Sequence, residues 1–365
     1  MSDELSRIAE LRRESWSLPA CATKVSLLEE AVRIADLHGD LDQGYSLRQD
    51  LMEAATFSGR DDVLLVAFAW CLAQFDREPD RFDRWHLFWK YKWVVGNAPN
   101  FPTISRAQIE SLLDDMQRRF QQAGFSLHCV HQKRRDVMCS LRDLAAANQS
   151  HELFIRARRD ALSDCAACVE CNTGEYFELL EDWEAAWSSY AKIAEGTLRC
   201  HVEPLRSTSH ALLPLLRLNQ REKAIELQKK VARLLSKSED PTRRAAEHVT
   251  FLAVIGETAR AKRIFERYLP GVLASVAPLD RLHMYAAGVL LLDRLAAKGP
   301  AVKMQLPAAL PPADEQGRRE IAPLRAWLES EAEQIARQFD ARNGNEGHLR
   351  ELREVPSLFE LGAAL

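Results

Sequence analysis

The stretch NTGEYFELLEDWEAA, residues 172–186, decides the fold class because residues of the same kinds return at fixed intervals along the chain. Residues 211–224 and 249–261 align with it. One column of this alignment is always large and apolar and holds Phe177, Leu215 and Leu252. Another is always alanine, with spacings of 224 − 186 = 38 and 261 − 224 = 37 residues, and holds Ala186, Ala224 and Ala261. A repeat of this length predicts pairs of antiparallel helices that stack on one another.

Two further features of the repeat predict how the helices of a pair meet. The position between the two helices, where we expect a turn, holds Glu181, Asn219 and Gly256. The alanine column opens the second helix, and its small side chains let the two helices approach closely. We expect Gly174 to lie where a neighbouring helix must come close.

The run LLEDWEAA at residues 179–186, followed by Tyr190, resembles the signature of the tetratricopeptide repeat (TPR) family. Gly174 and Phe177 match the glycine and tyrosine positions of that signature. The next two repeats keep the alanine and the apolar columns but lack the glycine. The resemblance is therefore carried by one well-matched repeat and two divergent ones.

The TPR resemblance covers residues 163–270, and a weaker match spans residues 24–57, with Gly44 in the alanine column. It implies an all-α fold, a right-handed superhelical solenoid of antiparallel helix pairs with an additional N-terminal helical region. The composition also favours helices, because 15 glycines are roughly 4% of the chain against an average of about 7%. A many-stranded fold needs more turns than so few glycines supply.

Four segments are expected along the chain. Residues 1–160 form an N-terminal helical region, which is either a set of divergent repeats or a separate bundle. Residues 163–298 hold the repeats and a closing helix. Residues 299–323 contain five prolines and predict an extended connector. Residues 324–365 form a last helix and a tail, which either packs back on the repeats or docks on a partner.

The overall composition restricts the class of partner. The formal net charge of −4 makes nucleic acid an unlikely ligand, because nucleic-acid binding usually needs a basic surface. The longest apolar run, residues 63–73, is about half the roughly 20 residues that a membrane-spanning helix needs. Residues 1–13 do not resemble a secretory signal, so the eight cysteines predict reduced thiols and a cytoplasmic location.

The TPR resemblance also implies where a partner would bind, because in that family the first helix of each pair lines a concave groove. The residues of this chain that match such positions are Asn172, Glu175, Arg206, His210, Arg243 and Glu247. Some family members hold a C-terminal carboxylate with Asn, Lys and Arg in these columns. Here the asparagine and arginines are present, but Cys171 or Ser209 stands where the lysine is expected. A helix or an extended segment of a partner protein is the other ligand that such a groove would bind.

Three cysteines, Cys165, Cys168 and Cys171, have a spacing typical of metal ligands, and Cys200 and His201 are further candidates. On one helix, however, three-residue steps spread the thiols over a stripe of about 120 degrees instead of pointing them at one ion. Small polarizable side chains also suit close helix packing. We therefore expect these cysteines to pack, with no metal site and no cofactor.

Sequence signatures of enzymes are missing, since no phosphate-binding loop, nucleophile elbow or zincin motif is found. The sequence predicts a non-catalytic scaffold or adaptor that binds another protein or a peptide. One alternative is a bacterial peptide-sensing regulator with an N-terminal output bundle. A third hypothesis is a metal-dependent enzyme that uses the cysteines. The oligomeric state stays open.

Overall fold

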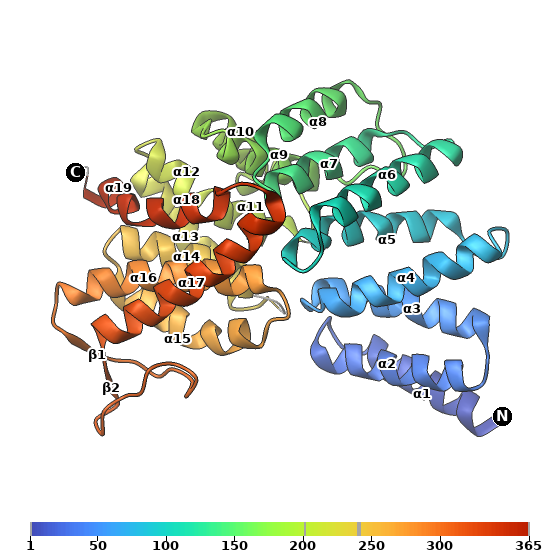
Figure 1. Cartoon of the computed structure of the whole chain (residues 1–365), viewed down its shortest axis with the longest axis horizontal. Helices are drawn as coiled ribbons and strands as arrows, with labels where there is room; N and C mark the ends of the chain where they lie inside the picture. The colour runs from blue at the N-terminus through green and yellow to red at the C-terminus, as the bar shows by residue number, and fades with distance from the viewer. Residues whose placement is uncertain (1, 201, 239–241, 364–365) are drawn as a thin grey trace. The chain divides into compact units, whose positions relative to one another are not determined.

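The computed structural model describes residues 2–200, 202–238 and 242–363 of the chain. Apart from two short strands, the regular structure in these ranges is helical, as expected for an all-α protein (Figure 1). The chain divides into two units. The first comprises Met1–Pro99, Ala107–Lys133 and Leu153–Ser163, and the second comprises Asn100–Arg106, Arg134–Glu152 and Asp164–Leu365. Residues 134–152 thus group with the repeats and not with the N-terminal region.

The N-terminal part of the chain is a succession of helices. They are α1 (Ser2–Trp16), α2 (Ala22–Leu37), α3 (Leu41–Phe57), α4 (Asp61–Arg77), α5 (Arg84–Asn97), the short 3-10 helix Ala98–Asn100, α6 (Arg106–Gln122), α7 (His128–Ser140) and α8 (Leu144–Arg156). In the first unit, α1 packs against α2, α2 against α3, α3 against α4 and α4 against α5 (Figure 1). Gly39 allows the turn from α2 to α3 because its φ is 67°. The Asp40 side chain then caps α3 by accepting from the Gln43 N–H at 3.0 Å.

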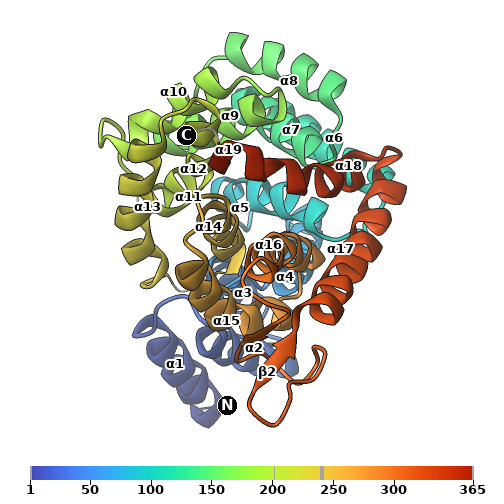
Figure 2. The same cartoon turned by 90° about the vertical axis from the view of Figure 1, so that its left-hand side faces the viewer.

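The second unit contains the repeats and the C-terminal elements. They are α9 (Ala166–Leu179), α10 (Trp183–Ala194), α11 (Glu203–His210), α12 (Leu212–Arg217), α13 (Arg221–Leu235), α14 (Thr242–Val254), α15 (Thr258–Ala274), α16 (Pro278–Ala296), β1 (Ala301–Lys303), β2 (Arg318–Glu320), α17 (Ile321–Asn343), α18 (Gly347–Glu354), the 3-10 helix Val355–Phe359 and α19 (Glu360–Ala363). Helix α9 packs against α10, α12 against α13 and α14 against α15. Helix α14 also packs against α11 and α16 (Figure 2).

The first helix of the middle repeat is divided at Ala211 into α11 and α12. Pro214 supplies the reason, because it has no N–H to donate to the carbonyl four residues back, at His210. Helix α11 still packs against α9 and α14. It therefore keeps its place between the corresponding helices of the neighbouring repeats.

The repeat columns have equivalent conformations in the structure. All three turn residues adopt the left-handed conformation, with φ of 57° at Glu181, 56° at Asn219 and 86° at Gly256. The alanine column is completely buried in all three repeats. A Cβ on Gly174 would lie 2.4 Å from Cε1 of Tyr190. The close approach that we predicted at this glycine is confirmed.

A fourth copy of the turn lies at Arg142. This residue belongs to residues 1–160, the region for which the sequence left open whether the helices are divergent repeats or a separate bundle. Arg142 has a φ of 58°, and Ala147, five residues later, is fully buried in the position of the alanine column. Asp143 caps α8 by accepting from the Ala146 N–H, as Asp182 caps α10. The interval to the next turn is 181 − 142 = 39 residues.

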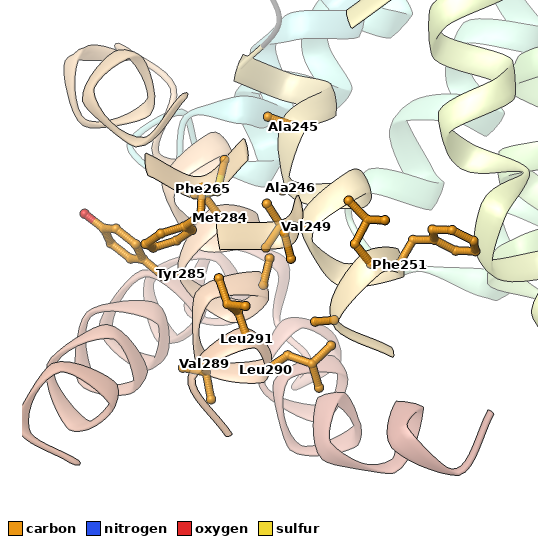
Figure 3. Packing of buried hydrophobic residues seen from close by; sticks show 14 of the residues in the cluster. Ala245, Ala246, Val249, Phe251, Phe265, Met284, Tyr285, Val289, Leu290 and Leu291 are labelled. Atoms are coloured by element: carbon orange, nitrogen blue, oxygen red, sulfur yellow. The ribbon is translucent and has the colours of Figure 1, made fainter. Parts of the chain in front are cut away.

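The core of the second unit is built largely from α14, α15 and α16. Val249 and Phe251 come from α14, Phe265 from α15, and Met284 and Leu290 from α16 (Figure 3). Each of these five side chains is almost completely removed from solvent. Burial of this apolar surface is the main source of stability in such a helical array.

Two C-terminal expectations have different outcomes. The connector predicted to be extended contains a small antiparallel hairpin instead, in which Val302 of β1 pairs with Arg319 of β2. Arg319 is buried there, and its guanidinium donates to the Leu306 carbonyl at 2.9 Å, which offsets part of the cost of removing the charge from water. The tail packs back on the second unit, as one of the two predicted outcomes, since Phe359 contacts the core and lies under the Arg294 guanidinium.

Candidate functional site

Charged and polar side chains gather on the first helices of three successive repeats. We call this group the polar cluster; it consists of Asn172, Glu175 and Glu178 of α9, Glu203, Arg206 and His210 of α11, and Arg244 and Glu247 of α14. The cluster forms because α11 packs against both α9 and α14, so that polar residues on the three helices meet.

Arg206 links α9 to α11 within the polar cluster. Its guanidinium donates to Oδ1 of Asn172 and, at 2.7 Å, to Oε1 of Glu203. It also lies 3.5 Å from Oε1 of Glu175. Burial alone would raise the pKa of Glu203, but the charge of Arg206 holds this pKa at about 2. Glu203 and Arg206 are therefore a fully ionised pair at neutral pH.

Arg244 links α11 to α14 at the other end of the cluster. Its Nη1 atom donates to Nε2 of His210 and to Oε1 of Glu247, both at 2.7 Å. Burial, together with Arg244 and Arg206, lowers the pKa of His210 well below its ordinary value. His210 is thus neutral at pH 7, with Nε2 as a hydrogen-bond acceptor.

Two carboxyl groups of the cluster hold their protons more tightly than usual. Burial raises the pKa of Glu247 to about 7, and its Oε2 atom has no hydrogen-bond partner among the described residues. Burial also raises the pKa of Glu178 well above its ordinary value, although Glu178 accepts a hydrogen bond from the Tyr190 hydroxyl. The Tyr190 ring stacks on His210, with centroids 6.0 Å apart.

The polar cluster is accessible from solvent despite this desolvation. Glu175 has 35% of its side chain exposed, and Arg206 has 29%. His210 keeps 20% and Glu247 keeps 24%. A ligand that approaches this face would therefore meet both guanidinium groups and carboxyl groups whose pKa is raised.

The structure brings together five of the six binding residues that the resemblance implied, namely Asn172, Glu175, Arg206, His210 and Glu247. The side chain of the sixth, Arg243, lies outside the described residues. The adjacent Arg244 provides a guanidinium of the cluster, and the sequence did not identify it. Glu203 was also missed, although an acidic residue directly before a proline is a usable signal for a helix start, and α11 begins there.

The cysteines are arranged differently from the expectation. The prediction that three thiols share one helix is wrong, because α9 begins at Ala166 and Cys165 is its N-cap residue. The Sγ atoms of Cys165, Cys168 and Cys200 all lie within 4.8 Å of one another. Cys171 is separate, with its Sγ 3.6 Å from Oε1 of Glu175. His201 lies outside the described residues.

A hollow of about 280 Å³ is also present in the second unit, lined by Arg142, Asn345, Glu346, Gly347, Arg350 and Arg353. Its basic lining suggests an anion site, but Arg142 is already 2.5 Å from Oε1 of Glu351. The N–H groups of His348 and Leu349, at the start of α18, donate to Asp340. Since these donors are paired within the chain, we assign no ligand to the hollow.

No helix in the ranges that the structure describes is long and apolar enough to cross a bilayer. Comparison of the chain with models of known protein families finds no match, and comparison with curated proteins finds none either.

Proposed function

We propose that this chain is a non-catalytic, TPR-like interaction module that binds a segment of a partner protein at the polar cluster. The observation that supports the proposal most directly is the gathering of solvent-accessible charged side chains on α9, α11 and α14. A helix packing for stability alone would bury apolar side chains on this face. Partly buried charges that meet from three successive repeats instead leave a polar face on which a partner segment can bind.

The excess of carboxyl over guanidinium groups favours a basic ligand, which would ionise the carboxyl groups that hold their protons. Four carboxyl groups face two guanidinium groups; the carboxyls belong to Glu175, Glu178, Glu203 and Glu247, and the guanidiniums to Arg206 and Arg244. A lysine or arginine side chain of the partner would favour ionisation of Glu178 and Glu247, because an opposite charge lowers the pKa of a carboxyl group. The cluster would then gain two charge-assisted hydrogen bonds.

A C-terminal carboxylate fits the cluster less well. Arg206 and Arg244, which would have to hold it, already donate to Glu203 and Glu247. A carboxylate ligand would therefore compete with these glutamates and add a further negative charge. We accordingly propose a basic internal segment as the ligand, and not a free C-terminus.

Binding of matched synthetic peptides to the full chain tests this proposal. From a random peptide array, we expect lysine- or arginine-containing sequences to be selected, and amidation of the peptide C-terminus to leave their affinity unchanged. Glu175→Gln should weaken binding about tenfold, the effect of one charge-assisted hydrogen bond. Glu333→Gln on α17, an exposed glutamate paired with Arg337, is the matched control.

Two results would contradict the proposal. Loss of affinity on amidation, with no effect of Glu175→Gln, would establish a carboxylate clamp instead. Selection of no peptide, or equal effects of the Glu175 and Glu333 substitutions, would show that the cluster is not a binding surface.

A further inference from the structure

Three thiols from two segments of the second unit meet at one point. Cys165 is the N-cap residue of α9, Cys168 lies in the first turn of α9, and Cys200 lies in the segment between α10 and α11. The Sγ atoms are all within 4.8 Å of one another, and those of Cys168 and Cys200 are 3.7 Å apart. Within the described ranges, no other three histidine, cysteine or carboxylate side chains converge in this way.

The arrangement has the dimensions of a metal site. Ligand sulfurs at about 2.3 Å from Zn²⁺, in a tetrahedron, stand about 3.8 Å apart. The distance between Cys168 and Cys200 already has this value. The N–H of Cys168 donates to Sγ of Cys165 at 3.4 Å, which orients that sulfur in the way that outer hydrogen bonds orient metal ligands.

We propose that Cys165, Cys168 and Cys200 bind one Zn²⁺ ion. As the three Zn–S bonds form, the three S–H bonds break and their protons pass to solvent, with no change of oxidation state. The three thiolates leave the fourth tetrahedral position to a further donor such as water. The site goes beyond the proposed interaction function and does not depend on it.

The other cysteines show why simple packing does not explain this group. Cys71, Cys129 and Cys171 are completely buried and contribute to cores, as free cysteines usually do. Cys165, by contrast, is exposed, and Cys168 and Cys200 are only partly buried. Cys21 and Cys139 are partly buried too, but among the described residues neither belongs to such a group of thiols. A disulfide does not fit the observed arrangement either, because 3.7 Å between Cys168 and Cys200 is well above an S–S bond of about 2.05 Å.

The position of the site indicates a structural role for the ion. Cys200 precedes the first residue of α11, Glu203, by three positions. An ion held by Cys165, Cys168 and Cys200 would therefore attach the segment that leads into α11 to the N-terminal end of α9. Since α9 and α11 both carry residues of the polar cluster, the ion would also limit their relative movement.

Metal analysis of the full chain, produced without a polyhistidine tag and kept reduced, tests the proposal. We expect one equivalent of Zn²⁺ per chain after loading and dialysis. Replacement by Co²⁺ should give the visible bands of a tetrahedral site and thiolate-to-cobalt charge transfer. Cys165→Ser and Cys200→Ser should lose both signals. Cys21→Ser should keep them, because Cys21 precedes α2 as Cys165 precedes α9 but belongs to no such group of ligands among the described residues.

Cys171→Ser distinguishes the ligand set observed in the structure, which contains Cys200, from the set that the sequence spacing suggests, which contains Cys171. If the sequence triplet of Cys165, Cys168 and Cys171 binds the ion, this variant loses the Co²⁺ bands and Cys200→Ser keeps them, which would overturn the proposal. Substoichiometric metal in the wild-type chain after loading would overturn it as well.

A measurement on the wild-type chain covers the case in which the serine variants fail to fold. Zn²⁺ added to the metal-free chain should slow alkylation of Cys165, Cys168 and Cys200, mapped by mass spectrometry, while that of Cys21 stays unchanged. Equal rates with and without Zn²⁺, or a disulfide between Cys168 and Cys200 in the reduced preparation, would contradict the proposal.

Discussion

Two helix–helix interfaces, which we call seams, each pair an aromatic ring with a glycine. The first seam joins α9 to α10, and the second joins α15 to α16. They differ in whether the glycine lies on the helix before or after the one that carries the ring. Tyr190 on α10 faces Gly174 on the preceding helix, where a Cβ would lie 2.4 Å from the ring. Phe265 on α15 stands four residues after Ala261, as Tyr190 stands four residues after Ala186, but it faces Gly288 on the following helix. A Cβ on Gly288 would lie 2.7 Å from Cε2 of Phe265. The aromatic residue at this position of the repeat therefore packs against the preceding helix of its own pair in one case. In the other case it packs against the helix that follows the pair.

The two seams also differ in what the ring does besides packing. The Tyr190 hydroxyl donates to Glu178, and its ring stacks on His210, so the first seam is connected to the polar cluster. Phe265 has no polar atom and lies among apolar side chains (Figure 3). Packing changes at the first seam should therefore alter both stability and the polar cluster, whereas those at the second should alter stability alone.

Adding a methyl group at either glycine is expected to have the largest effect. Gly174→Ala and Gly288→Ala should each lower the free energy of unfolding by about 2 to 3 kcal/mol, the upper part of the usual cost of overpacking, since both rings are completely buried. Urea denaturation followed by circular dichroism measures the loss. Only Gly174→Ala should also weaken peptide binding.

Gly96→Ala is the matched control for these substitutions. A Cβ at Gly96 would meet no heavy atom within 4 Å, and the residue lies in the last turn of α5. We expect unchanged or slightly higher stability, because alanine has the better helix propensity. A Gly174→Ala variant as stable as Gly96→Ala would show that the first seam is looser than the distances indicate.

The glycine pairing also shows how far the sequence determines the fold. Column matching located Gly174, the alanine column and the turn residues, because these positions depend on contacts within one helix pair. It did not identify Gly288 as the partner of Phe265, since that contact joins consecutive pairs. The turn at Arg142 was missed, although LRDLAAA at residues 141–147 repeats the leucine, aspartate and alanines of LEDWEAA at residues 180–186.

The candidate sites were predictable to different degrees for a related reason. Residues one helical turn apart, such as Asn172 and Glu175 or Arg206 and His210, follow from helix periodicity once the repeats are aligned. Whether Arg243 or Arg244 points into the polar cluster depends on the rotation of α14 about its axis. The alignment of this divergent repeat is not precise enough to determine that rotation. Cys200 is separated from Cys168 by α10, so its approach depends on how the helix pair folds back.

The pH dependence of stability gives a second, smaller difference, between the polar cluster that the first seam adjoins and the apolar second seam. Glu247 has a folded-state pKa of about 7, above the ordinary value of about 4.3 that applies when the chain is unfolded. The folded chain therefore binds more protons between these values, so this group's contribution to stability falls as pH rises from about 4.3 to 7. Glu247→Gln removes this contribution.

Glu247→Gln should therefore gain stability relative to wild type as pH rises, by on the order of 2 kcal/mol between pH 5 and pH 8. Urea denaturation of both proteins at the two pH values measures the difference. The histidines His248 and His283, whose pKa burial lowers to about 4, act in the opposite direction but are present in both proteins. Gly288→Ala, at the apolar seam, should show the same loss at both pH values. A constant difference between Glu247→Gln and wild type would contradict the raised pKa.

Removal of one hydroxyl group at the first seam should have the smallest effect. Tyr190→Phe makes this residue chemically equivalent to Phe265 and removes the hydrogen bond to Glu178. The loss should be about 1 kcal/mol, the usual net contribution of one buried hydrogen bond, with helical content unchanged. Because that bond lowers the pKa of Glu178, its removal should raise this pKa further, which carboxyl NMR titration detects. A loss as large as that of Gly174→Ala would instead mean that the hydroxyl, and not the fit of the ring against the glycine, holds α9 and α10 together.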